Sequence, residues 1–211
     1  MGTTTIRRVT LVLYSSPVSG NALKVRFLLA ELGLEYETVD VPFDDWPRPD
    51  WYRALNPVGR IPTLRDDDLV LAESNAILRY LAAREHRDDL YPAELRARAR
   101  IDWLLDAWST VLRPALFPLE RAAGLIGARD EKLVEQAVPA AEAALNVIEQ
   151  LVAENGTMSG SFTIADICAA PALFRSANLP LPLDFTRWPR LTRIRQAVTG
   201  RPAFLAANPV R

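Results

Sequence analysis

Side chains that commonly act as nucleophiles or metal ligands are scarce in this sequence. Its 211 residues include one cysteine, Cys168, and one histidine, His86. One cysteine cannot form an internal disulfide, and this pair cannot supply the nitrogen and sulfur ligands of a zinc site. We therefore expect no structural metal and no catalysis by a Cys–His or Ser–His pair. Cys168 lies in an apolar run, where a buried and unreactive thiol is expected.

Hydroxyl groups gather in one short segment, SSPVSGN at residues 15–21, directly before an apolar periodic segment that begins near Ala22. The N-terminus of a helix attracts negative charge, and a hydroxyl there can donate a hydrogen bond to a thiolate. Ser19 lies just before the predicted helix, Ser15 lies in the same loop and Tyr14 directly precedes it. Asn21 and Ser16 are the rivals or assistants of Ser19, and simple helix capping is the structural alternative.

Two further positions lie where predicted strands begin or end. Pro62 follows Ile61 at the start of a predicted strand, where a cis peptide bond would turn the chain sharply. Glu73 and Ser74 lie where a strand gives way to a helix, so Ser74 is predicted to be the N-cap. The unpaired N–H groups of such a helix start attract a carboxylate.

The elements that would position these residues form an α/β unit. An apolar run at 9–14 predicts a strand, the periodic segment 22–32 predicts a helix ended by Gly33, and the alternating residues 36–41 predict a second, parallel strand. An irregular helix is expected at 50–55 and a helix at 74–84. Residues 61–65 and 69–71 predict an antiparallel hairpin around an acidic turn.

From residue 92 onward the pattern predicts helices only. The expected helices cover 93–111, 131–154, 164–176 and 188–199, with a short turn after Pro202. Pro114 and Pro118 are expected to kink or end the first of them. Thr163 and Asp166 have the spacing of a capping box behind Phe162, to which we assign a structural role. We expect two domains, 1–86 and 92–211.

Composition limits the partners of such a protein. The chain has 25 Lys and Arg against 26 Asp and Glu, a formal charge of −1, so it lacks the basic surface that nucleic-acid binding needs. Its apolar stretches are shorter than the roughly 20 residues of a membrane span, and the first residues lack a signal-peptide core. We expect a cytoplasmic protein without nucleic-acid or membrane partners.

Several segments of the chain together resemble the cytosolic glutathione transferase superfamily, in a bacterial-type form with a serine in the active-site loop. The segments are LYSSPVSGNALKVRFLLAELGLEYE, NPVGRIPTL with LAESNAILRYL, and SFTIADICAAP with RWPRLTRIRQAVTGRPAF. The resemblance implies a thioredoxin-like N-terminal domain of βαβ-α-ββα order, an all-helical C-terminal domain, glutathione as co-substrate and a homodimer.

The resemblance also implies roles for individual residues. Pro62 would be cis, and the backbone of Ile61 would bind the cysteinyl part of glutathione. Glu73 and Ser74 would hold its γ-glutamyl group, and Arg60 is a candidate for its glycyl carboxylate. Ser19 would stabilise the thiolate. The absence of cysteine from this loop argues against disulfide or glutathionylation chemistry.

A second substrate would then bind between the domains. We expect its hydrophobic pocket to be bordered by Trp108, Leu112 and Leu116, with Trp46 as a lid. The implied activity is transfer of glutathione to a hydrophobic electrophile. The alternatives are a glutathione-dependent peroxidase or isomerase, and a non-catalytic glutathione-binding or regulatory protein.

Overall fold

A computed structural model describes residues 11–43 and 46–208, so the first two residues of the predicted strand 9–14 lie outside the described part. The chain forms one mixed four-stranded sheet in the order β2-β1-β3-β4. Strand β1 runs parallel to β2 and antiparallel to β3, which pairs with β4 as a hairpin. The strands are β1 (Leu11–Ser15), β2 (Glu37–Asp40), β3 (Thr63–Asp66) and β4 (Leu69–Ala72). Both the βαβ unit and the hairpin were predicted.

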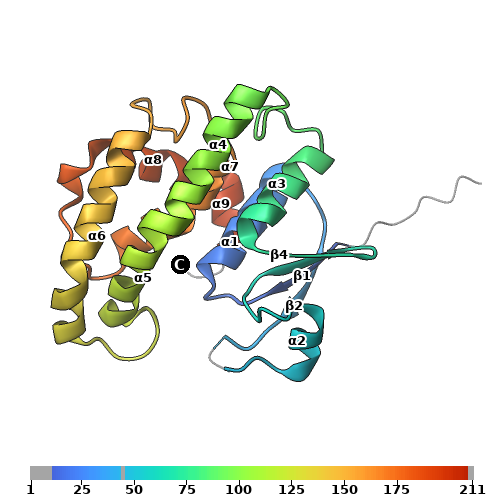
Figure 1. The fold of residues 1–211 in the computed structure, drawn as a ribbon, viewed down its shortest axis with the longest axis horizontal. Helices are drawn as coiled ribbons and strands as arrows, with labels where there is room; N and C mark the ends of the chain where they lie inside the picture. The colour runs from blue at the N-terminus through green and yellow to red at the C-terminus, as the bar shows by residue number, and fades with distance from the viewer. Residues whose placement is uncertain (1–10, 44–45, 209–211) are drawn as a thin grey trace, which may run out of the picture.

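The sheet carries helices on both faces (Figure 1). Helices α1 (Gly20–Leu32) and α3 (Ser74–Arg84) lie on one side and α2 (Asp50–Leu55) on the other. Gly33 ends α1 in the left-handed conformation, at φ 66°, and its N–H donates to the carbonyl of Ala30. This is the stop that the sequence predicted. The N-terminal part is therefore a thioredoxin-like domain, in which α1 leads directly from the end of β1.

The remainder of the described chain is helical. It comprises α4 (Leu95–Ala107), the π-helical segment η1 (Trp108–Leu112), α5 (Arg113–Glu120), a second π-helical segment η2 (Arg121–Leu125), α6 (Glu131–Leu151), α7 (Ile164–Asn178), the 3₁₀ turn η3 (Phe185–Arg187), α8 (Pro189–Thr199) and α9 (Pro202–Ala207). No helix among the described residues is long and apolar enough to cross a membrane.

The two prolines expected to interrupt the first long helix act differently. Pro114 falls at the start of α5, directly after η1, and Pro118 lies inside α5. The helical path nevertheless continues from α4 to Glu120. The π-helical segment η1, in which the Arg113 N–H donates to the Trp108 carbonyl, precedes Pro114, and the missing N–H of Pro114 falls in the first turn of α5. The sequence predicted a kink or an end at these prolines, and of these two outcomes the end is wrong.

Helix α7 is the centre of the helical domain and is buried over most of its length. It packs against α1, and α9 packs against α1 as well, so the N-terminal domain and the helical domain share one apolar core. The predicted capping box starts α7: the Asp166 carboxylate accepts from the N–H of Thr163 at 2.9 Å and from the N–H of Met158 at 2.7 Å. Burial raises the pKa of Asp166 to about 6. These contacts support the structural role assigned to it.

Candidate functional site

Ser19 is the N-cap of α1, at the end of the β1–α1 loop (residues 16–19). Its backbone is extended, and its Oγ accepts a hydrogen bond from the N–H of Ala22 at 3.2 Å. Accepting this bond leaves the hydroxyl hydrogen available to donate. The side chain is almost fully buried. Ser19 therefore caps the helix and can also stabilise an anion at the helix N-terminus.

The two rivals of Ser19 lie in different surroundings. Ser16 is buried, and its carbonyl oxygen accepts from Arg26 Nη1 at 3.2 Å and from the N–H of Ser19 at 3.1 Å. Asn21 is exposed in the first turn of α1 and faces a polar cavity. Ser16 is thus part of the loop support, whereas Asn21 is accessible to a ligand.

The polar cavity has a volume of about 340 Å³ and lies between α1, α3 and the helical segments α4, η1 and α5. It brings together Asn21, Arg60, Glu73 and Ser74, four of the residues that sequence reasoning selected. Its other lining residues are Lys24, Asn75, Ala76, Arg79, Asp106, Ser109 and Arg113. Both charge signs are present, so the cavity can bind a zwitterionic group.

The start of α3 supplies the backbone donors of this cavity. Glu73 is the N-cap, with φ 66°, and Ser74 is the first helical residue, so the prediction of Ser74 as N-cap was wrong by one position. The first helical bond runs from Ile77 N–H to the Glu73 carbonyl at 3.0 Å. The N–H groups of the preceding first-turn residues therefore have no acceptor within the helix and can bind a carboxylate.

The turn before β3 is held in a fixed conformation. The Ile61–Pro62 peptide bond is cis, as predicted. Tyr52 Oη and Asn56 Nδ2 each donate to the carbonyl of Arg60 at 2.8 Å. Within the described residues, no hydrogen bond engages the backbone N–H or carbonyl of Ile61, so a peptide-like ligand can pair with it as a strand does.

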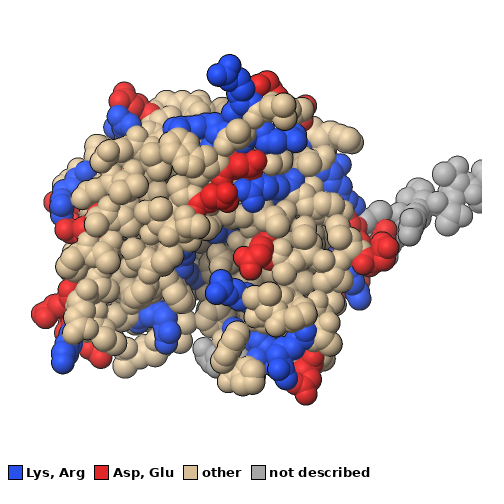
Figure 2. Space-filling view, viewed as in Figure 1, with Lys and Arg blue, Asp and Glu red and all other residues tan. Residues whose placement is uncertain are grey.

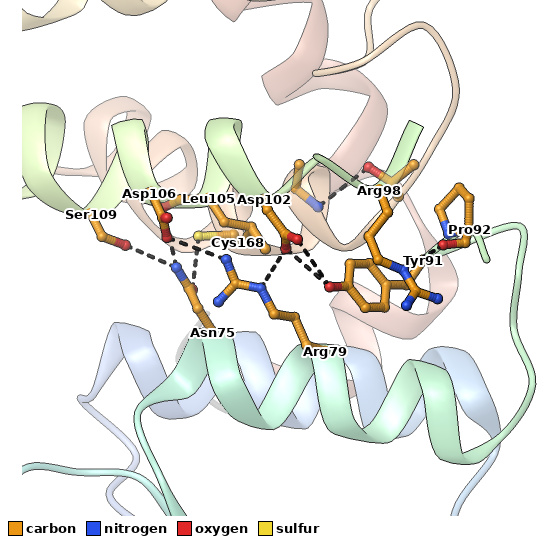
Figure 3. Close-up of polar contacts among 12 residues, drawn as sticks. Asn75, Arg79, Tyr91, Pro92, Arg98, Asp102, Leu105, Asp106, Ser109 and Cys168 are labelled. Atoms are coloured by element: carbon orange, nitrogen blue, oxygen red, sulfur yellow. Dashed lines mark hydrogen bonds and ion pairs between the residues drawn. The ribbon is translucent and has the colours of Figure 1, made fainter. Parts of the chain in front are cut away.

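Polar contacts fix α3 against the helical domain (Figure 3). Asn75 Nδ2 donates to Ser109 Oγ at 2.9 Å and to the Leu105 carbonyl at 3.2 Å. One turn further along α3, Arg79 pairs with Asp102 at 2.5 Å. The thiol of Cys168 is buried and contacts Asn75 Oδ1 at 3.4 Å. This network holds the residues beside Ser74 in place.

The apolar cavity lies elsewhere than the sequence predicted. Trp108, Leu112 and Leu116 are fully buried in the core, and the Nε1–H of Trp108 has no hydrogen-bond partner among the described residues. Leu112 and Leu116 pack into the core beside α6, whereas Trp108 borders a small internal cavity next to Gly20 and Asn21. Trp46 is exposed and lies beside Gly59 and Arg48, so no contact supports a lid over this region.

A cavity of about 360 Å³ opens beside Ser19 instead. Its lining is largely apolar, with Arg175 as its one charged residue among those described. The lining residues are Pro17, Val18, Ser19, Leu23, Leu125, Phe174, Arg175, Asn178, Leu179 and Asn208. Ser19 thus borders a space that can take an apolar molecule with a few polar groups.

Sequence reasoning missed three basic residues that surround the first turn of α1. Lys24, Arg113 and Arg175 line a small internal cavity next to Gly20 and Asn21, and no acidic residue lines it in the described part of the chain. Lys24 is nearly fully buried, and its side-chain ammonium group makes no hydrogen bond or ion pair with any described residue. Lys and Arg side chains are visible in the hollow between the two domains (Figure 2). A charged residue inside an apolar helical run was the available signal for Lys24.

Comparison with known proteins matches both halves of the chain. Residues 18–84 match the N-terminal domain of glutathione S-transferases and residues 131–197 match their C-terminal domain. Glutathione S-transferase 3 of Zea mays is 37% identical over 205 residues, covering 92% of this chain and 91% of its own. A maleylacetoacetate isomerase of Pseudomonas aeruginosa is 30% identical over 207 residues, covering 93% and 95%.

A solved structure agrees over the same length. The theta class glutathione S-transferase from the citrus canker pathogen Xanthomonas axonopodis pv. citri, with glutathione bound, superposes with a TM-score of 0.84 at 28% identity. It covers 96% of this chain and 99% of that one. Fold, both domain matches and relatives along nearly the whole chain lead to the same conclusion: this protein belongs to the cytosolic glutathione S-transferase superfamily.

Proposed function

We propose that this protein is a glutathione transferase that ionises glutathione and delivers its sulfur to an electrophile. The observation that carries the proposal is a set of complementary groups: the open start of α3, the unbonded backbone of Ile61, and the hydroxyl of Ser19 at the start of α1. These groups match the two ends and the thiol of glutathione. A relative of similar fold has glutathione bound.

The γ-glutamyl end of glutathione fits the polar cavity. Its carboxylate would accept from the free N–H groups at the start of α3 and from Ser74, and its ammonium would pair with Glu73. The cysteinyl unit would pair with the backbone of Ile61. Arg60 lines the same cavity and would bind a carboxylate of the ligand, with the glycyl carboxylate as the predicted partner.

The thiol would then lie near Ser19, whose hydroxyl donates to the sulfur while the α1 N-terminus adds positive potential. No general base is required, because the thiol proton passes to water. In the transfer step the thiolate forms a carbon–sulfur bond, and a leaving group such as chloride departs with the bonding electrons. The 360 Å³ cavity beside Ser19 would hold the electrophile.

Isomerisation is the second candidate activity, because a maleylacetoacetate isomerase is among the relatives. It uses the same glutathione thiolate, as does a peroxidase. A protein that binds glutathione without turnover is the non-enzymatic alternative. We further propose that the protein acts in the cytoplasm as a homodimer.

A panel of reactions with purified protein tests these proposals together. Glutathione is combined in turn with aryl halides, epoxides, conjugated enals, hydroperoxides and a cis-enedioic acid, and each rate is compared with that of Ser19→Ala. Conjugation faster than the uncatalysed rate supports the transferase. Turnover confined to the hydroperoxides or to the cis acid supports the alternatives. Glutathione binding without any turnover would reject the enzymatic proposal.

A further inference from the structure

The guanidinium groups of one buried and one partly buried arginine bind the three carbonyls that precede Ser19. Arg26 donates to the Ser16 carbonyl at 3.2 Å and to the Pro17 carbonyl at 3.4 Å. Arg175 donates to the Val18 carbonyl at 2.5 Å. Arg26 belongs to α1, whereas Arg175 reaches the loop from α7 in the helical domain. The β1–α1 loop is therefore supported from both domains.

Arg175 contacts the chain on both sides of Ser19. Besides its bond to Val18, its guanidinium packs against Gly20, where an added Cβ would lie 2.8 Å from Nη1. Only a glycine lets the cation approach so closely. Arg175 also borders the apolar cavity that contains Ser19. The positive charge of Arg175 is thus held against Val18 and Gly20, the two residues that flank Ser19 in the sequence.

The charges around Arg175 leave a positive excess. Glu120 is fully buried and accepts from Arg113 Nη1 at 2.9 Å, while Arg175 Nη1 is 3.8 Å from the same carboxylate oxygen. One carboxylate therefore faces two guanidinium groups, and Lys24 and Arg26 add further positive charge from α1. Burial lowers the pKa of Arg175, Glu120 raises it and Arg113 lowers it. A guanidinium remains protonated under such conditions.

We propose that Arg175 is a positioning residue of the helical domain that holds the loop at Ser19 and favours the thiolate of bound glutathione. The inference rests on the proposed function. Arg175 acts in two ways: its bond to Val18 fixes the loop, and its charge lies close to the sulfur. Glu120 opposes the second effect, because its negative charge offsets part of that potential.

The test is the pKa of the glutathione thiol when bound, followed by the ultraviolet absorbance of the thiolate against pH. Arg175→Met should raise this pKa by about half a unit to one unit, the effect of a unit charge roughly 7 Å away at an effective dielectric constant of about 40 to 80. Arg175→Lys should recover part of the shift. Glu120→Gln should lower the pKa, because it removes the opposing charge. With a bound thiol pKa near 7, turnover of Arg175→Met at pH 7 should fall about two- to fivefold.

The opposite signs separate this role from a purely structural one. Misfolding or loosening of the domain interface would impair Arg175→Met and Glu120→Gln alike, whereas the proposal requires shifts in opposite directions. Arg193→Met is the matched control, because Arg193 also donates to a backbone carbonyl, that of Glu154, but from an exposed position on α8. Glutathione affinity, measured by calorimetry, should change less than threefold in Arg175→Met.

Two outcomes would overturn the inference. One is an unchanged thiol pKa in folded Arg175→Met, and the other is a shift of the same sign in Arg175→Met and Glu120→Gln. Failure of the proposed function is a different result: the wild-type protein would then bind no glutathione, or would bind it with an unperturbed thiol. The wild-type titration therefore distinguishes the two failures before any variant is compared.

Discussion

Replacing Ser19 by alanine removes two interactions that can be measured separately. The first is the cap: loss of the 3.2 Å bond from the Ala22 N–H should lower the free energy of unfolding by about 1 kcal/mol. The second is the donor to sulfur, since a hydrogen bond to a charged group contributes about 1.5 to 3 kcal/mol, which corresponds to about one to two pKa units. Taking a bound thiol pKa near 7, the thiolate fraction at pH 7 would fall about five- to fiftyfold.

Turnover at pH 7 should fall by the same factor and partly recover at high pH, where the thiol ionises unaided. The assay pairs a pH titration of thiolate absorbance with the pH profile of turnover for wild type, Ser19→Ala and Ser19→Thr, which keeps the hydroxyl. Binding should change little, because the contacts at Ile61 and Glu73 do not involve sulfur. If the wild-type and Ser19→Ala titration curves coincide, Ser19 is not the donor, and Asn21→Ala is the next variant.

The remaining predictions concern binding, stability and assembly. Glu73→Ala or Ser74→Ala should each weaken glutathione binding about tenfold or more, because a charged ligand group loses a hydrogen bond; unchanged affinities by calorimetry would reject this part of the site. Burial raises the pKa of Asp166 from 3.8 to about 6, so the folded state binds this proton more tightly than the unfolded state does. The stability gained from protonation is therefore complete below about pH 4 and is lost as pH rises through about 6. Chemical denaturation should show this loss, up to about 3 kcal/mol, in wild type and not in Asp166→Asn, with glutathione affinity intact in both. Exposed apolar residues on α4, including Leu95 and Trp103, favour a dimer in sedimentation experiments, and a monomer at micromolar concentration would contradict it.

The elements of the thioredoxin-like domain were predictable because each has a local signal. Alternating and periodic apolar residues defined the strands and helices, and Gly33 marked the end of α1. The cis bond at Pro62 was expected from the family resemblance. The cap was predicted one residue too late, at Ser74, because the choice between Glu73 and Ser74 depends on the positive φ of Glu73. Such a backbone angle leaves little trace in residue types.

The apolar cavity beside Ser19 was not predictable in the same way. An apolar stripe on a helix faces either the core or a cavity, and the pattern alone does not distinguish them. Leu112 and Leu116 line none of the cavities described above, and Trp108 borders only the small one beside Gly20. The positions of Arg113 and Arg175 depend on how the helical domain packs against α1. Residues far apart in sequence meet there, and a single sequence carries no signal for that contact.

Proton release on binding tests most directly the claim that this protein binds glutathione as the thiolate. A free thiol with a pKa near 8.5 is about 3% ionised at pH 7, whereas a bound thiol with a pKa near 7 is about half ionised. Calorimetric titrations in two buffers of different ionisation enthalpy should therefore show about half a proton released per glutathione bound at pH 7. S-methylglutathione, which has no thiol proton, should bind without this release. Equal proton release for the two ligands, or no binding of either, would contradict the account.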